Sequence, residues 1–219
     1  MKAVIFDMDG VLVNSEPLHF EFERRIAESL GFSMSGEDLK PFVGISNFNF
    51  WTILKEQYGL KQDVEWLMEN DRIKRLEFFM AWENIVLIPG VEDLLKSLRA
   101  AGCKIGLASS SPVKMIDVFL EKTNAGKYFD YILSGFDVEH GKPAPDIFLR
   151  TAENLGVKPE DCLVVEDSTN GVKAAAAAGM KCLGFRNPDS GNQDLTKATF
   201  ILDSFEGIGF NYMKTLFEG

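Results

Sequence analysis

The chain has 219 residues, of which 46% are hydrophobic and 26% charged, and these proportions are typical of a folded globular protein. Its formal net charge of −10 creates a field that repels phosphate polymers and anionic lipid surfaces, so we expect neither nucleic acid nor a membrane as a partner. A small anionic substrate would need a local positive site to overcome this field.

The first predicted element is a strand at residues 3–7, a short apolar run that ends in polar residues and Gly10. No charged leader or long apolar stretch precedes it. No run in the chain approaches the roughly 18 apolar residues of a membrane span, so we expect a cytoplasmic protein.

The next stretch, residues 15–82, carries helical patterns without a convincing strand. Apolar residues recur there at helical spacing, Ser46 can cap one of the helices, and a further helix is expected from about 62 to 82. We therefore predict an all-helical domain at 15–82, inserted into a core domain that is formed by residues 1–14 and 83–219.

Strand-like runs return in the second part of the chain, at residues 104–109, 131–134, 162–166 and 181–185. Amphipathic helical patterns separate them, and this alternation predicts an α/β fold with a doubly wound parallel sheet. The cysteines lie in or beside the apolar runs and show no CxxC spacing, so we expect neither a disulfide nor a zinc site at Cys103, Cys162 and Cys182.

Polar side chains follow the predicted strands at the edge of the sheet where open α/β sheets bind ligands. They are Asp7, Asp9, Ser109, Ser110, Lys142, Glu166 and Asp167. Four carboxylates in a small area repel one another unless a cation lies among them, and oxygen ligands without His or Cys favour Mg²⁺. One carboxylate can attack phosphorus and a second can transfer the proton, so the pattern indicates phosphoryl transfer.

Four segments in this order resemble the motifs of the haloacid dehalogenase superfamily, and most of all its β-phosphoglucomutase-like phosphatase branch. They are DMDGV at 7–11, Ser109 after an apolar strand, GKPAPD around Lys142, and VVEDSTNG around Glu166 and Asp167. The resemblance covers almost the whole chain and implies a Rossmann-like core with a helical cap.

The resemblance also implies a role for each of these residues. Asp7 would be the covalent nucleophile and Asp9 the general acid/base. The implied ligands of Mg²⁺ are Asp7, the carbonyl of Asp9, Asp167 and, at or near the metal, Glu166. The implied phosphate-binding residues are Ser109, Ser110 and Lys142.

Candidate substrate contacts in the cap are His19, Asn47 and Lys74. In β-phosphoglucomutases a His at the place of His19 faces the active site. The mutases also carry an Arg in the segment that corresponds to residues 44–47 here, whereas this chain has Asn47, and a bisphosphate intermediate needs a cation for its second phosphate.

We therefore predict a Mg²⁺-dependent phosphatase that hydrolyses a small phosphorylated metabolite through an aspartyl-phosphate on Asp7. One alternative is a β-phosphoglucomutase-type sugar-phosphate mutase, with Arg72 or Lys74 in place of the missing Arg. A second is a phospho-accepting signalling module similar to response-regulator receivers, which are shorter and lack the helical insertion. The sequence predicts neither the substrate nor the oligomeric state.

Overall fold

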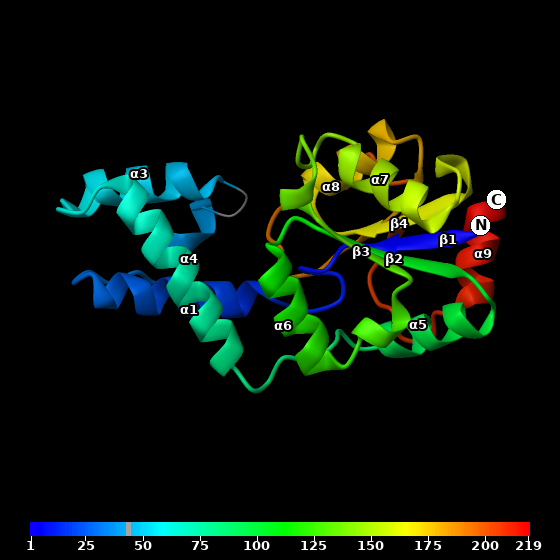
Figure 1. Ribbon diagram of the computed structural model, residues 1–219, viewed down its shortest axis with the longest axis horizontal. Helices are drawn as coiled ribbons and strands as arrows, with labels where there is room; N and C mark the ends of the chain where they lie inside the picture. Colours follow the sequence, from blue (N-terminus) through cyan, green and yellow to red (C-terminus); the bar gives the residue numbers. More distant parts are fainter. Residues whose placement is uncertain (43–44) are drawn as a thin grey trace. The chain divides into compact units, whose positions relative to one another are not determined.

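The structure, a computed structural model, describes residues 1–42 and 45–219. The chain folds into two compact units, both drawn in Figure 1. One is formed by residues 1–14 and 84–219 and is called the core unit here. The other, residues 15–83, is called the helical unit.

The core unit contains a six-stranded parallel sheet with the strand order β3-β2-β1-β4-β5-β6. The strands are β1 Ala3–Phe6, β2 Lys104–Ser109, β3 Tyr131–Ser134, β4 Cys162–Glu166, β5 Lys181–Phe185 and β6 Phe200–Leu202. This order confirms the predicted doubly wound sheet. Successive strands are added on one side of β1 up to β3 and on the other side from β4 to β6, so the switch point lies between β1 and β4, where such sheets bind ligands. The sequence reading missed β6, because its three residues are too few to show a pattern.

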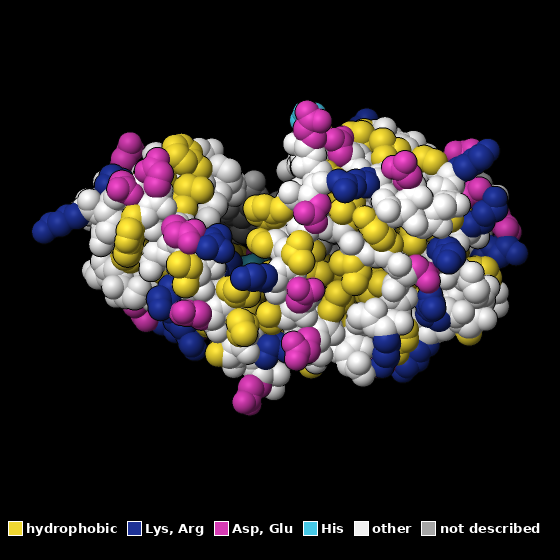
Figure 2. Space-filling view, viewed as in Figure 1, with side chains coloured by type: hydrophobic (Ala, Val, Ile, Leu, Met, Phe, Trp, Pro, Cys, Tyr) yellow, Lys and Arg dark blue, Asp and Glu magenta, His cyan; other side chains and the backbone are white. Residues whose placement is uncertain are grey.

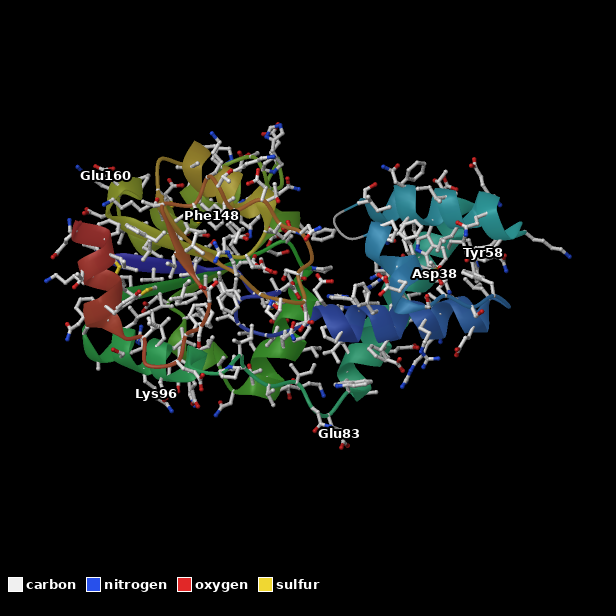
Figure 3. All side chains as sticks on the ribbon, turned by 180° about the vertical axis from the view of Figure 1, so that it is seen from behind. Asp38, Tyr58, Glu83, Lys96, Phe148 and Glu160 are labelled. Atoms are coloured by element: carbon white, nitrogen blue, oxygen red, sulfur yellow. The ribbon has the colours of Figure 1, made fainter. Side chains whose placement is uncertain are left out.

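Helices cover both faces of this sheet. They are α5 Val91–Ala100, α6 Val113–Thr123, α7 Asp146–Leu155, α8 Thr169–Ala177 and α9 Phe210–Glu218, with short 3-10 turns η2 Gly126–Tyr128, η3 Gly135–Asp137 and η4 Pro159–Asp161. Helices α7 and α8 lie on one face, and α5 and α6 lie on the other (Figure 1). Phe148 of α7, labelled in Figure 3, is fully buried against the first face. Every residue of β1 is buried, which explains why this strand reads as a continuous apolar run.

The helical unit consists of helices alone among its described residues: α1 Glu16–Ser29, α2 Gly36–Leu39, the 3-10 turn η1 Lys40–Phe42, α3 Asn47–Tyr58 and α4 Val64–Ala81. Ser46 caps α3 as predicted, since its Oγ accepts a hydrogen bond from the Asn49 N–H at 3.2 Å. The unit has its own apolar core around the fully buried Trp51 and Leu67.

The described surface carries charges of both signs. Acidic and basic side chains are interspersed over the face shown in Figure 2. In the parts of the chain that the structure describes, no helix combines the length and the apolar character needed to cross a bilayer.

Candidate active site

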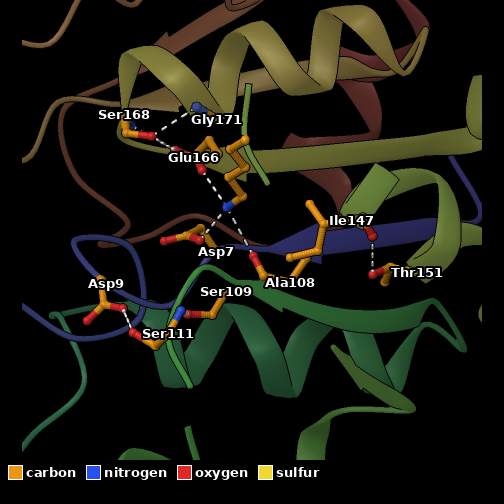
Figure 4. A network of polar contacts seen from close by, with 11 residues as sticks. Asp7, Asp9, Ala108, Ser109, Ser111, Ile147, Thr151, Glu166, Ser168 and Gly171 are labelled. Atoms are coloured by element: carbon orange, nitrogen blue, oxygen red, sulfur yellow. Dashed lines mark hydrogen bonds and ion pairs between the residues drawn. The ribbon is translucent and has the colours of Figure 1, made fainter. Parts of the chain in front are cut away.

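A buried ammonium group lies between two carboxylates at the carboxyl ends of the central strands (Figure 4). Lys142 Nζ donates to Asp7 Oδ1 at 2.5 Å, to Glu166 Oε1 at 2.7 Å and to the carbonyl oxygen of Ala108 at 3.1 Å. The exposed fractions of the three charged side chains are only 5% for Lys142, 8% for Asp7 and 1% for Glu166. A buried charge is retained only when it is paired, so these three groups hold one another in place.

Lys142 reaches the site from the loop between β3 and α7. Pro145 is the N-cap residue of α7, which begins at Asp146. The ammonium group also lies 4.9 Å from the ring centroid of Phe148, so an aromatic face supports the cation from α7.

Glu166 ends β4, and both of its carboxylate oxygens are engaged. Besides the Oε1 contact to Lys142, Oε2 accepts from the N–H of Ser168 at 2.7 Å and from its Oγ at 2.9 Å. Ser168 in turn caps α8, because its Oγ accepts from the Gly171 N–H at 3.0 Å. A Cβ at Gly171 would lie 1.7 Å from Glu166 Oε1, so only glycine leaves room for the carboxylate.

The backbone turns sharply after Asp9, at Gly10. Gly10 has a φ of +77°, and a Cβ at this position would lie 1.9 Å from Oδ2 of Asp167. Asp167 is itself buried, with 6% of its surface exposed, and its Oδ2 accepts a hydrogen bond from Ser190 Oγ. The turn therefore brings the first and fourth motifs together.

Asp9 is held by Ser111, which follows the two serines predicted to bind phosphate and to which no role is assigned from the sequence. Ser111 Oγ donates to Asp9 Oδ2 at 2.8 Å (Figure 4). The N–H of Ser111 donates to Ser109 Oγ at 3.0 Å, and its carbonyl oxygen accepts from Ser134 Oγ at 2.7 Å. Ser109 is fully buried and Ser110 is exposed, so the two adjacent serines predicted to bind phosphate differ in access.

The cluster carries more negative than positive charge. Burial raises the pKa of Asp7 to about 7, and repulsion from Glu166 and Asp9 adds to this effect while Lys142 opposes it. Burial also raises the pKa of Asp167, helped by the neighbouring Glu166 and Asp7. Burial disfavours the charge of Lys142, but the carboxylates of Asp7 and Glu166 outweigh it and keep its pKa above the usual value.

This donor set fits Mg²⁺. No three His, Cys, Asp or Glu side chains among the described residues converge to enclose an ion. Mg²⁺ rarely needs such a cage, since it binds through one or two carboxylates and keeps places for water and phosphate oxygens. Asp7, Asp167 and the carbonyl of Asp9 offer oxygen ligands of this kind, and an added cation would offset the surplus negative charge. Glu166 is less suited to direct binding, because Lys142 and Ser168 already occupy both of its oxygens.

The candidate contacts in the helical unit lie on three different helices. His19 belongs to α1, Asn47 is the exposed first residue of α3, and Lys74 of α4 is exposed and paired with Glu77 at 2.9 Å. Arg72 is paired with Glu69 at 2.6 Å. Gly44, in the segment compared with the mutase Arg, lies outside the described residues.

The sequence reading missed Arg75, which contacts His19. Arg75 Nη1 lies 2.9 Å from His19 Nδ1. Nε and Nη2 of the same guanidinium form bidentate hydrogen bonds at 3.0–3.2 Å to the carboxylate of the fully buried Asp71. A guanidinium can only donate, so His19 Nδ1 is the acceptor in this contact. The ion pair of Asp71 and Arg75 could be predicted, because residues four apart on a helix lie side by side. The contact of Arg75 with His19 on another helix could not be predicted from the sequence.

A family model described as haloacid dehalogenase-like hydrolase matches residues 1–179. The phosphorylated carbohydrates phosphatase of Thermotoga maritima is 38% identical over 183 residues, which cover 83% of this chain and 83% of the relative. Hexitol phosphatase B of Escherichia coli is 32% identical over 195 residues, 87% of this chain and 86% of that protein. The crystal structure of a β-phosphoglucomutase from Clostridium difficile superposes with a TM-score of 0.79 at 26% identity, covering 100% of this chain and 97% of the other. With its four motifs gathered at one edge of the sheet, the chain belongs to the haloacid dehalogenase-like hydrolase family.

Proposed function

We propose that this chain is a Mg²⁺-dependent phosphatase that hydrolyses a phosphorylated carbohydrate or a similar small phosphate monoester, with Asp7 as the nucleophile. The observation that carries the proposal is the buried contact of Lys142 with Asp7 and Glu166. It supports the proposal because a pre-formed cation beside a carboxylate is what attack on a phosphoryl group requires. The names of the phosphatases from Thermotoga maritima and Escherichia coli support the substrate class.

Asp7 begins the reaction. Lys142 engages Oδ1, which leaves Oδ2 for the attack on phosphorus. The Oδ2–P bond forms as the bond between phosphorus and the ester oxygen breaks, and Lys142 stabilises the charge that gathers on the phosphoryl oxygens. The bound Mg²⁺ would supply further stabilisation of that charge. Buried Ser109 and exposed Ser110 lie at the end of β2, where hydroxyl and N–H groups can donate to phosphate.

Asp9 moves the proton. In the first step it gives its proton to the departing alkoxide, which leaves as an alcohol. In the second step it takes a proton from water as the water oxygen attacks phosphorus, and the Oδ2–P bond to Asp7 breaks to release inorganic phosphate. Ser111 keeps the Asp9 carboxyl oriented for both transfers through its 2.8 Å hydrogen bond. We also propose that the helical unit serves as the cap, and that His19 and Asn47 contribute to substrate choice.

The test is a phosphate-release screen with Mg²⁺ over phosphorylated sugars, sugar alcohols, phosphoglycolate, nucleotides and pyrophosphate. Asp7→Asn should abolish release, because it keeps the shape of the side chain but removes the nucleophile. Asp93→Asn is the matched control, since the Asp93 side chain is 86% exposed on α5. Normal turnover in Asp7→Asn would exclude the covalent mechanism.

A second variant separates the two carboxyl groups of the first motif. Asp9→Asn should lower turnover by about a hundred- to ten-thousand-fold, the usual effect of removing a general acid/base. The phospho-enzyme should then break down slowly, and label on Asp7 that hydroxylamine removes would report it. If Asp9→Asn turns over like the parent, another group transfers the proton.

The mutase alternative rests on the likeness to β-phosphoglucomutase. Against it, the two cations considered for the second phosphate, Arg72 and Lys74, are each paired with a glutamate on α4. Incubation of β-glucose 1-phosphate with enzyme, Mg²⁺ and a trace of the 1,6-bisphosphate distinguishes the two reactions. We expect phosphate release, whereas rapid formation of glucose 6-phosphate would establish a mutase.

A further inference from the structure

The loop after β5 forms a tight turn whose two end residues point at the candidate site. The turn is Asn187-Pro188-Asp189-Ser190, closed by a hydrogen bond at 3.2 Å from the Ser190 N–H to the Asn187 carbonyl oxygen. Asn187 Oδ1 also accepts from the Asp189 N–H at 2.9 Å. Asn in first place and Pro in second are the residues that favour such a turn, so the local sequence explains its shape.

Each end residue contacts a different motif of the site. Asn187 Nδ2 donates to the carbonyl oxygen of Gly10 at 3.0 Å, and Ser190 Oγ donates to Oδ2 of Asp167. Both side chains are buried, with 7% of Asn187 and 5% of Ser190 exposed. A Cβ at Gly10 would lie 2.9 Å from Ser190 Oγ, so the two contacts adjoin each other.

The turn is fastened to the start of α8. Gln193 Nε2 donates to the Ser190 carbonyl oxygen at 2.9 Å, and Gln193 Oε1 accepts from the Thr169 N–H at 2.9 Å. The Asp194 N–H donates to Thr169 Oγ1 at 2.7 Å. Since Thr169 follows Asp167 by two residues, the loop and the carboxylate that it contacts are tied to the same helix end.

We propose that Ser190 and Asn187 are positioning residues that set the metal-binding geometry of the site. Ser190 fixes the orientation of the Asp167 carboxylate by occupying Oδ2, which leaves Oδ1 for Mg²⁺. Asn187 fixes the Gly10 backbone and with it the adjacent carbonyl of Asp9. This inference rests on the proposed metal site. Partners behind a metal ligand typically account for about 10- to 100-fold in metal affinity.

The experiment uses the full chain, stripped of metal, and measures its melting temperature across a series of Mg²⁺ concentrations. Mg²⁺ that binds only the folded protein stabilises it by RT ln(1 + [Mg²⁺]/Kd), so the rise in melting temperature across the series gives a Kd without reference to activity. Ser190→Ala should raise that Kd by about 10- to 100-fold. Asn187→Ala should move it in the same direction.

Two matched variants separate positioning from a merely structural role. Ser190→Thr keeps the hydroxyl and should restore the parent's Kd for Mg²⁺. Ser204→Ala removes an exposed hydroxyl that accepts from the Glu206 N–H at 3.1 Å, and it should leave that Kd unchanged. A loss of packing alone would lower the melting temperature without Mg²⁺ but would not change the Kd.

The outcomes for the inference and for the proposed function differ. If the parent binds Mg²⁺ and releases phosphate while Ser190→Ala binds Mg²⁺ equally well, the positioning role is overturned and the phosphatase stands. If Ser190→Ala weakens Mg²⁺ binding but the parent hydrolyses no phosphate ester, the positioning role stands and the phosphatase is overturned. If the parent shows no response to Mg²⁺, both are overturned.

Discussion

Replacing Lys142 by Met tests the energetics of the buried cluster most directly. The substitution keeps most of the side-chain volume but removes the ammonium group and its three hydrogen bonds, to Asp7, Glu166 and Ala108. Two carboxylates that are 8% and 1% exposed then face each other without a cation. Removing one partner of a buried ion pair typically costs about 3–5 kcal/mol.

The expected loss can be converted into a melting temperature. For a chain of 219 residues each kcal/mol corresponds to roughly 2–4 °C, so Lys142→Met should melt about 6–20 °C below the parent. The assay is thermal unfolding followed by circular dichroism in metal-free buffer, because a bound cation could replace the lost charge. The transition to follow is that of the core unit, since a chain of two units need not unfold in one step.

Two further variants decide whether charge is the cause. Lys142→Met combined with Glu166→Gln removes one of the stranded charges and should recover part of the loss. Lys158→Met is the control, because this lysine is 78% exposed and lies 3.8 Å from Glu160, so its removal should change stability by no more than about 0.5 kcal/mol. If Lys142→Met melts with the control, the cluster is not held by its ion pairs and the reasoning fails.

Three other predictions concern activity, stability and thiol reactivity. Gly171→Ala should lower both activity and stability, the latter by about 1–3 kcal/mol, because the new Cβ displaces the Glu166 carboxylate. Gly36→Ala is the control for both measurements, because the space around Gly36 is open. Burial raises the pKa of Glu23 above its ordinary 4.5, although the charge of Arg75 opposes this shift. The Glu23 carboxyl therefore stabilises the folded state below pH 4.5, and this stabilisation is lost as the pH rises through the raised pKa. Glu23→Gln should therefore raise the melting temperature at pH 7 and not at pH 4; an equal change at both would contradict the raised pKa. Burial raises the pKa of every cysteine thiol, so the native protein should resist iodoacetamide at pH 8 and react fully only when unfolded, whereas rapid native labelling would show an exposed thiolate (Cys103, Cys162 and Cys182).

Most of the fold could be predicted because the core strands are buried on both faces. Residues 162–165 of β4 must all be apolar, and that composition is visible without any knowledge of the neighbouring strands. The three-residue β6 has one exposed, one half-buried and one buried residue, so it carries no such run. Elements of this kind are specified by the strand they pair with, here β5, and not by their own sequence.

The meeting of Asp7, Lys142 and Glu166 could be predicted for a different reason. Parallel strands all end at one edge of the sheet, so residues at strand ends converge whatever path the intervening chain takes. The contacts that orient these residues do not follow from topology. Ser111 to Asp9 and Asn187 to Gly10 join residues 102 and 177 positions apart, and each depends on the exact course of a loop.

The turn at Asn187 shows which features of a loop can be predicted from the sequence and which cannot. Its shape is local, since Asn and Pro at its first two positions favour it, and a reader of the sequence could have placed a turn there. Its target is not local, because the direction in which Nδ2 and the Ser190 hydroxyl point is set by how β5 ends and how Gln193 ties the loop to α8. Catalytic side chains can thus be predicted from the sequence when the topology of the sheet brings them together. The groups that orient those side chains can be identified only from the three-dimensional course of the loops.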